Sequence, residues 1–314
     1  MSRNADIKTF ALPFINSSQT ANAFFVKGER GVMIDCGPKQ ITPENPLLSG
    51  LEKCGEDPGA VNVYFTHGHQ DHTGGAAAML SLGAGLFITE PDSAFLCDHA
   101  KAFASEMLPV CRMTDQNDDE IAASKKELIA TLSSETKEIK MIAPGDKIDL
   151  GGLTLYVTDL SGHTGGSVGY YSEYEGILLA GDSVCGTGPR DGCFPLICST
   201  ESYIATMIRL KTADTKRMLL SHDFSAPGLG PAYDFAGKSL EKLISASLEF
   251  AERLRDETAK HKEQQDASFT DVCNEIIAAM PESYGYLPVE KQQAPLLTLR
   301  TLVFALRDYA GWEI

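Results

Sequence analysis

The histidine-rich segment at residues 66–72 is the part of this sequence best equipped for chemistry. It reads Thr-His-Gly-His-Gln-Asp-His and holds three of the seven histidines of the chain within six positions, with one acid between them. The segment follows an apolar run that predicts a buried strand, and a loop leaving a strand can turn alternate side chains toward one point. Because imidazole and carboxylate suit zinc, iron or manganese, His67 and His69 are expected to ligate one metal ion. Asp71 and His72 are expected to reach a second.

Three more residues of ligand type follow apolar strand patterns later in the chain. His163 lies in Ser-Gly-His-Thr-Gly-Gly-Ser between two such patterns, Asp182 follows Leu-Ala-Gly, and His222 follows Leu-Leu-Ser. Open α/β sheets place their sites at the carboxyl ends of strands. Each residue alone fits a loop position satisfied by backbone hydrogen bonds equally well, but their order after the first motif favours one shared site.

The elements that must position these residues alternate between strand and helix. Strand patterns are expected at residues 7–14, 21–28, 31–36, 61–65, 85–89, 138–143, 147–150, 153–159, 167–171, 176–180 and 218–220. A helical segment from 74 to 82 separates two of these strands, and this order is typical of an α/β fold. The length of 314 residues suggests about two structural units.

Two mainly helical regions interrupt or follow the α/β pattern. Residues 92–137 are expected to form a helical insertion, and everything after about residue 231 reads as helix. We therefore divide the chain into a catalytic domain at 1–230 and a C-terminal helical region at 231–314. The insertion either caps the metal ions or packs onto the core through its apolar side chains, which are Phe95, Phe103, Met107, Leu108 and Met113.

The charge balance restricts the partners of the protein. With 27 Lys and Arg against 43 Asp and Glu, the net charge is −16, which disfavours binding to nucleic acid or to an anionic membrane. The sequence shows no transmembrane stretch, no secretory signal near its start, and eight cysteines without a C-x-x-C pair. We expect a cytoplasmic protein with reduced thiols that acts on a small-molecule substrate.

The H-x-H-x-D-H motif, with the later G-H-T-G-G-S and G-D segments and His222, resembles the metallo-β-lactamase-fold superfamily of metallohydrolases over about residues 7–226. The resemblance implies an α/β fold, a four-layer αββα sandwich with metal ions at the edge of its two sheets, here with a helical insertion and a C-terminal helical extension. The metal ligands that it implies are His67, His69 and His163 for the first ion, Asp71, His72 and His222 for the second, and Asp182 as the bridge. Asp35 matches the early acid of the family and is expected to orient ligands without touching the metal ions.

The same resemblance implies a reaction. Two divalent cations, with zinc expected and iron or manganese as alternatives, would generate a bridging hydroxide near neutral pH and polarise the substrate oxygen. Asp71 would also orient this hydroxide. A bridging acid is expected in members that resemble glyoxalase II, the lactonases and the phosphodiesterases, whereas true β-lactamases generally lack it. We therefore expect a dinuclear hydrolase of a small ester, thioester or lactone. A phosphodiesterase and a mononuclear iron dioxygenase of the persulfide-oxidising kind are the alternatives.

Two residues outside the ligand set are candidates for substrate contact. Arg190 either meets a carboxylate or phosphate of the substrate or is a surface arginine paired with Asp191. Tyr170, which follows the segment of His163, either reaches the site or fills the core. The insertion and the C-terminal helices are expected to set substrate choice, and the C-terminal helices are also candidates for a homodimer interface.

Overall fold

Two six-stranded β-sheets form the centre of the molecule. The computed structural model describes residues 6–14, 20–39, 45–188, 192–292 and 295–313. The first sheet has the spatial order β1 (Asp6–Pro13), β2 (Thr20–Lys27), β3 (Gly31–Ile34), β4 (Asn62–Tyr64), β5 (Leu86–Thr89) and β6 (Ile139–Ile142). The second has the order β12 (Leu229–Ala236), β11 (Arg217–Ala226), β10 (Ile177–Leu179), β9 (Val168–Ser172), β8 (Thr154–Asp159) and β7 (Lys147–Asp149).

The sheets pack face to face because their strands alternate apolar side chains between two buried faces. In β2, for example, Phe24 belongs to the apolar cluster between the sheets, whereas its neighbour Phe25 points into the cluster on the outer side of the first sheet. Leu155 and Val157 of β8 contribute from the second sheet to the same inter-sheet cluster as Phe24. The strands are therefore buried on both faces, as expected where helices cover a sheet on its outer side.

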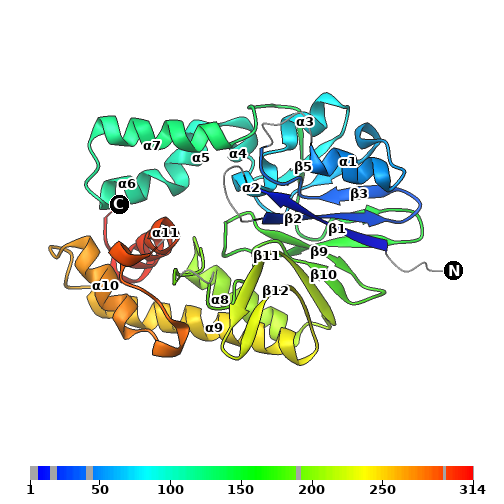
Figure 1. The fold of residues 1–314 in the computed structure, drawn as a ribbon. Helices are drawn as coiled ribbons and strands as arrows, with labels where there is room; N and C mark the ends of the chain where they lie inside the picture. The colour runs from blue at the N-terminus through cyan, green and yellow to red at the C-terminus, as the bar shows by residue number, and fades with distance from the viewer. Residues whose placement is uncertain (1–5, 15–19, 40–44, 189–191, 293–294, 314) are drawn as a thin grey trace.

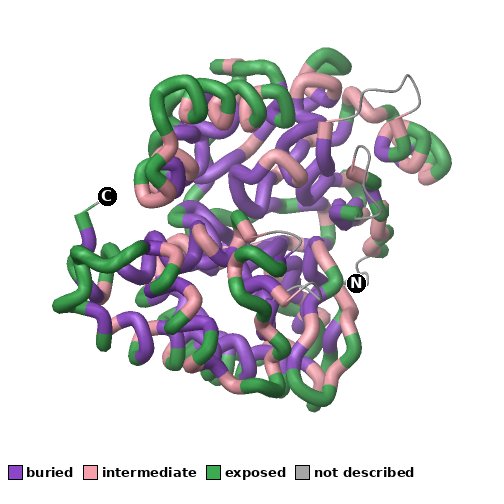
Figure 2. The backbone as a smooth tube through the Cα atoms, turned by 60° about the vertical axis from the view of Figure 1, so that its left-hand side comes forward, coloured by how far each residue is buried: buried purple, intermediate pink, exposed green. Residues whose placement is uncertain are grey.

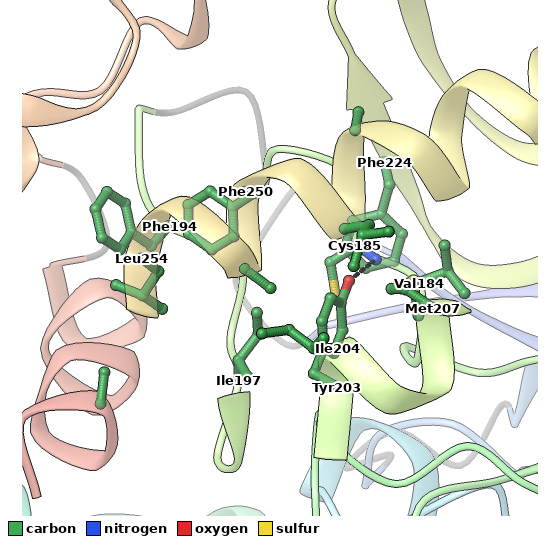
Figure 3. Packing of buried hydrophobic residues seen from close by; sticks show 14 of the residues in the cluster. Val184, Cys185, Phe194, Ile197, Tyr203, Ile204, Met207, Phe224, Phe250 and Leu254 are labelled. Atoms are coloured by element: carbon green, nitrogen blue, oxygen red, sulfur yellow. Dashed lines mark hydrogen bonds between the residues drawn. The ribbon is translucent and has the colours of Figure 1, made fainter. Parts of the chain in front are cut away.

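Helices cover the outer face of each sheet and complete four layers. On the first sheet, Leu47 and Leu51 of α1 (Pro46–Lys53) and Met79 of α3 (Ala76–Ser81) pack into the outer apolar cluster. On the second sheet, α8 (Thr200–Thr212) and α9 (Lys238–Thr258) contribute to a larger cluster, part of which is drawn in Figure 3. The predicted α/β class and the αββα sandwich are thus confirmed (Figure 1).

The inserted segment is helical, as predicted, and is divided into four helices. They are α4 (Ala94–Cys97), α5 (His99–Glu106), α6 (Leu108–Met113) and α7 (Asp118–Thr131). The first break comes at Asp98, whose side chain accepts the backbone N–H of Lys101 and so caps α5. The second falls next to Pro109, which occupies the first turn of α6, where its missing N–H costs nothing.

The second sheet extends further along the chain than expected. β11 runs to Ala226, and β12 crosses the predicted boundary between 230 and 231, so the C-terminal helical region begins at α9. The sequence of β12, Leu-Gly-Pro-Ala-Tyr-Asp-Phe-Ala, hides the strand because Gly and Pro usually indicate a loop. Pro231 is tolerated there since β12 is an edge strand with an unpaired side.

The C-terminal helices lie on the same side of the sandwich as the insertion (Figure 1). After α9 come α10 (Phe269–Ala279) and α11 (Pro295–Ala305), and α11 packs against α6 of the insertion. Much of this region is buried where it faces the rest of the molecule (Figure 2). Within the described part of the chain, no helix has the length and apolar character needed to cross a membrane.

Candidate metal centre

The residues predicted as ligands come together in two adjoining groups at one edge of the sandwich. The first group is His67, His69 and His163, and the second is Asp71, His72, Asp182 and His222. Within each group, the ligand atoms all lie within 4.8 Å of one another. The resemblance implies the same three histidines for the first ion, whereas Asp182, implied as a bridge, falls in the second group. Binding of ions by either group stays a prediction.

Local backbone structure explains how one short motif serves both groups. His67 and His69 lie in the loop after β4, whereas Asp71 and His72 lie on the short helix α2 (Gln70–Thr73), which begins directly after His69. The change from loop to helix turns the two pairs in different directions. His222 lies inside the long strand β11, where the pairing with β12 shifts register between Leu219 and Phe224. Such irregularities re-aim side chains next to active sites.

Each of the five clustered histidines has one ring nitrogen held by an oxygen outside the two groups. These contacts are His67 Nδ1 to Thr66 Oγ1 at 3.0 Å, His69 Nε2 to Glu106 Oε2 at 2.9 Å, His72 Nδ1 to Asp35 Oδ2 at 2.9 Å, His163 Nδ1 to the Leu196 carbonyl at 2.8 Å and His222 Nδ1 to the Thr20 carbonyl at 2.9 Å. The oxygen fixes the ring orientation and takes one N–H, so the other ring nitrogen, whose lone pair binds a cation once it is deprotonated, faces the cluster.

The inward-facing atoms fit cations well. His67 Nε2, His72 Nε2 and Asp182 Oδ1 are buried and have no hydrogen-bond partner. Buried polar atoms in proteins are almost always satisfied, so three unpartnered atoms of ligand type in one place fit a site that holds cations. Two further inward nitrogens, His69 Nδ1 and His163 Nε2, lie 3.0 Å apart and converge on the same point. The donor set of imidazole nitrogens and carboxylate oxygens is that of zinc, iron or manganese.

Asp35 occupies the supporting position that the sequence predicted. Its carboxylate accepts hydrogen bonds from the Thr66 N–H at 2.7 Å, the Thr66 hydroxyl at 2.8 Å and His72 Nδ1 at 2.9 Å. Through Thr66 it also fixes the ring of His67. Asp35 has a φ of 62°, a left-handed conformation that residues other than glycine rarely adopt. We infer that the three hydrogen bonds stabilise this strained backbone conformation. In that conformation the Asp35 carboxylate orients the rings of both His67 and His72.

The pKa values separate the two groups. Burial lowers the pKa of His67 and His69 well below the usual range, and the neighbouring imidazoles lower it further. Burial would also lower the pKa of His72, but Asp71, Asp182 and Asp35 raise it well above the usual value. For His222 the same opposition between burial and the two acids raises the pKa to about 9.

The two acids of the second group stay ionised. Burial would raise the pKa of Asp71, but His72 and His222 outweigh it and hold that pKa well below its usual range. Asp182 behaves in the same way: burial opposes ionisation, but His222 and His72 lower its pKa. The first group is therefore a set of neutral imidazoles, whereas the second is a network of opposite charges in the absence of a cation.

Three buried charged residues that the sequence did not single out support the site. Asp92 accepts the N–H groups of Gly68 at 2.8 Å and Gly166 at 2.9 Å and the hydroxyl of Thr164 at 2.7 Å, so it ties the loop of His67 to the loop of His163. Glu106, from the insertion, is the partner of His69, and Arg300, from α11, forms an ion pair with Glu106. Burial lowers the pKa of Arg300 to about 10, so its guanidinium remains charged at neutral pH.

The two residues proposed for substrate contact, Tyr170 and Arg190, are not found at the candidate metal centre among the described residues. Tyr170 is fully buried in the cluster between the sheets, and its hydroxyl donates to the Phe65 carbonyl at 2.6 Å. This placement supports the interpretation of Tyr170 as a residue that fills the core. Arg190 lies outside the described residues. Of the apolar insertion side chains, Phe95 lies against the ring of His69, with centroids 5.6 Å apart, whereas Met113 packs against the large cluster that includes the C-terminal helices.

A two-sheet sandwich flanked by helices, with His and Asp side chains that could hold metal ions gathered at its edge, defines a candidate metal-binding enzyme. A family model described as the metallo-beta-lactamase superfamily matches residues 19–222, and the chain belongs to this superfamily. The match includes all the predicted ligands and leaves out α9, α10 and α11.

Solved structures extend the likeness beyond the matched segment. A metallo-beta-lactamase family protein from Thermus thermophilus shows 17% identity and a TM-score of 0.65, covering 96% of this chain and 93% of its own. A beta-lactamase domain protein from Burkholderia ambifaria shows 17% identity and a TM-score of 0.63, covering 97% and 87%. At this identity the likeness shows the fold alone, but it spans both helical regions.

One curated relative carries a functional name. A hydroxyacylglutathione hydrolase from Erythrobacter litoralis (strain HTCC2594) is 35% identical over 74 residues, which are 23% of this chain and 30% of that protein. The match thus spans less than a third of the length of the relative.

Proposed function

We propose that the protein is a dinuclear metal-dependent hydrolase that cleaves a small ester, thioester or lactone. The position of Asp182 carries the proposal. Its Oδ2 lies 3.9 Å from His163 Nε2 in the first group, and 3.4 Å from His222 Nε2 in the second. A carboxylate between two ligand groups suits a bridge between two cations, as in two-metal hydrolytic sites.

Bound cations would supply Lewis-acid polarisation of the substrate and a hydroxide near neutral pH. The residues of this chain hold and orient the reactants. The ionised Asp71 is fixed by His222 Nε2 at 2.9 Å, so it is placed to accept a hydrogen bond from the attacking group and to orient it. Phe14 and Phe224 lie beside the ring of His222, each with its ring centroid 6.1 Å away, so apolar side chains border the second group.

The small thioester is the first substrate class to test, because the partial match to a hydroxyacylglutathione hydrolase supports it. The acidic net charge of −16 disfavours polyanionic substrates, although two bound cations would reverse the field inside the site. The cytoplasmic location and the homodimer through the C-terminal helices stay predictions.

Metal analysis combined with a substrate panel tests the proposal. The purified protein is loaded with zinc, iron or manganese and assayed against esters, thioesters, lactones and a phosphodiester. We expect two ions per chain and hydrolysis of a carboxylic ester, thioester or lactone. Turnover of the phosphodiester alone would favour a phosphodiesterase, and one iron per chain with oxygen uptake would favour a dioxygenase; either result contradicts the proposal.

A further inference from the structure

The polar residues of α11 are buried, although this helix is the last long one in the chain and lies outside the segment that defines the family. Thr298 and Thr301 are fully buried, and Arg300 is 8% exposed. Buried hydroxyl and guanidinium groups require partners, because leaving them without hydrogen bonds is costly. The Thr298 hydroxyl donates to Gln292 Oε1 at 2.7 Å, and the other partners described below lead toward the first ligand group.

The first connection runs from Arg300 to His69. Arg300 forms an ion pair with Glu106, whose Oε2 lies 2.9 Å from His69 Nε2, and Arg300 Nη2 itself lies 3.1 Å from the same ring nitrogen. Glu106 is itself only 8% exposed, so its charge needs the guanidinium to remain stable in this environment. When Glu106 accepts the Nε2–H of His69, Nδ1 keeps the free lone pair, which lies 3.0 Å from His163 Nε2.

The second connection runs from the two threonines to His163. The hydroxyl oxygens of Thr298 and Thr301 accept the N–H groups of Phe194 at 2.9 Å and Ile197 at 3.0 Å. The Thr301 hydroxyl also donates to the Pro195 carbonyl at 2.8 Å. The segment 194–197 is thus bound to α11 along its length.

This segment carries the carbonyl that orients His163. The Leu196 carbonyl accepts the Nδ1–H of His163 at 2.8 Å and so turns Nε2 toward the cluster. On its other side the segment is anchored by Phe194, whose ring packs edge-to-face on Phe250 of α9 with centroids 5.2 Å apart (Figure 3). Two of the three histidines of the first group therefore owe their orientation to contacts with α11.

The second group has no such connection among the described residues. His72 is oriented by Asp35, and His222 by the Thr20 carbonyl, and both of these partners belong to the first sheet or the turn that ends it. We propose that α11 is a positioning element for the first cation alone, acting through Arg300 and Glu106 on His69 and through the threonines on His163. The inference rests on the proposed function in that both require these histidines to bind a cation.

Zn²⁺ binding by the metal-free full-length protein, in competition with a chromophoric chelator, tests this proposal. Arg300→Gln and Glu106→Gln are each expected to weaken one of two Zn²⁺ equivalents by roughly ten- to hundredfold, the usual effect of removing an outer-sphere partner. The double variant should bind like either single variant, because both changes break one connection. Arg307→Gln, an exposed arginine just beyond α11, is the matched control and should bind like the wild type.

Two backgrounds identify the affected ion. His222→Ala weakens the second group and His67→Ala the first. We expect Arg300→Gln to reduce Zn²⁺ affinity in the His222→Ala protein and to leave it unchanged in the His67→Ala protein. Equal losses in both backgrounds, or no loss in either, would overturn the inference.

Thr301→Val provides a variant without any change of charge and should weaken the same equivalent less strongly. Arg300→Lys keeps the charge and should restore part of the affinity.

A purely structural role for α11 would lower the thermal midpoint of the metal-free protein and leave the Zn²⁺ affinities unchanged, which counts against the proposal. A wild-type protein that binds no Zn²⁺ would refute the proposed function together with this inference, whereas two tight equivalents in every variant would refute the inference alone.

Discussion

The two ligand groups are built from different parts of the molecule, although one short motif starts both. The second group is completed by strands of the sandwich and oriented by Asp35 and the Thr20 carbonyl, all within the family core. The first group is oriented by Glu106 from the insertion and by the Leu196 carbonyl, which α11 supports. All the candidate ligands thus lie within residues 19–222, whereas part of the support for the outer contacts of the first group comes from α11, which lies beyond that segment.

The groups also differ in charge. The first group holds three imidazoles with lowered pKa values. The second group holds two carboxylates with lowered pKa values and two imidazoles with raised pKa values. A cation entering the second group must displace protons, whereas a cation entering the first finds free lone pairs at neutral pH.

Removing the shared ligand should have the largest effect. Asp182→Asn keeps the shape of the side chain but removes the charge between the groups, which is expected to cost several kcal/mol of transition-state stabilisation, or more than about a hundredfold in kcat. The measurement is kcat on the best substrate of the panel, together with zinc content. Asp256→Asn, an exposed acid on α9, serves as the control, and a variant at Asp182 with wild-type kcat would contradict the bridging assignment.

Removing the carboxylate that joins the two loops should mainly affect folding. In Asp92→Asn, one oxygen becomes an NH₂ group that faces N–H and O–H donors, so we expect a loss of about 2 kcal/mol in the free energy of unfolding. Urea denaturation of the metal-free variant measures it. An unchanged midpoint would show that the loops of His67 and His163 are held independently.

The pH dependence of cation binding separates the groups. Because the pKa of His222 is raised to about 9 and that of His72 is also raised, protons compete with a cation at the second group throughout the neutral range. Its Zn²⁺ affinity should therefore rise between pH 6.5 and 8, by up to about tenfold per pH unit for each proton displaced. At the first group the lowered pKa values of His67, His69 and His163 predict little change over the same range. Titrations of the His67→Ala and His222→Ala proteins give the two slopes, and equal slopes would remove the proposed electrostatic difference.

The smallest effect is expected at a residue that belongs to neither group. Tyr170→Phe removes the hydrogen bond to the Phe65 carbonyl and should lower the free energy of unfolding by about 1 kcal/mol. Because the side chain is fully buried, KM should not change. A raised KM with unchanged stability would instead support the substrate contact considered from the sequence.

The sequence predicts which His and Asp residues come together at this edge because their signal is local. The H-x-H-x-D-H motif and the short segments around His163 and Asp182 carry residue type and strand context together. The αββα sandwich is implied by the family resemblance of these segments, and it is confirmed. β12 was not predicted because its Gly and Pro residues are typical of a loop. An edge strand tolerates both residues.

The outer contacts of the first group could not be predicted in the same way. Glu106 and Arg300 are 194 positions apart, and only the packing of the insertion against the C-terminal helices brings them together. A weak signal does exist, since Arg300 stands with two threonines in an otherwise apolar helix. A charged residue in such a helix must find a partner, but the sequence does not say which one.

Anomalous diffraction from crystals of the zinc-loaded protein would show directly whether Asp182 joins two ions. We expect two zinc peaks per chain, one among His67, His69 and His163 and the other at the second group, with the Asp182 carboxylate touching both ions. A single peak, or two peaks with Asp182 bound to only one, would contradict a dinuclear centre bridged by this residue.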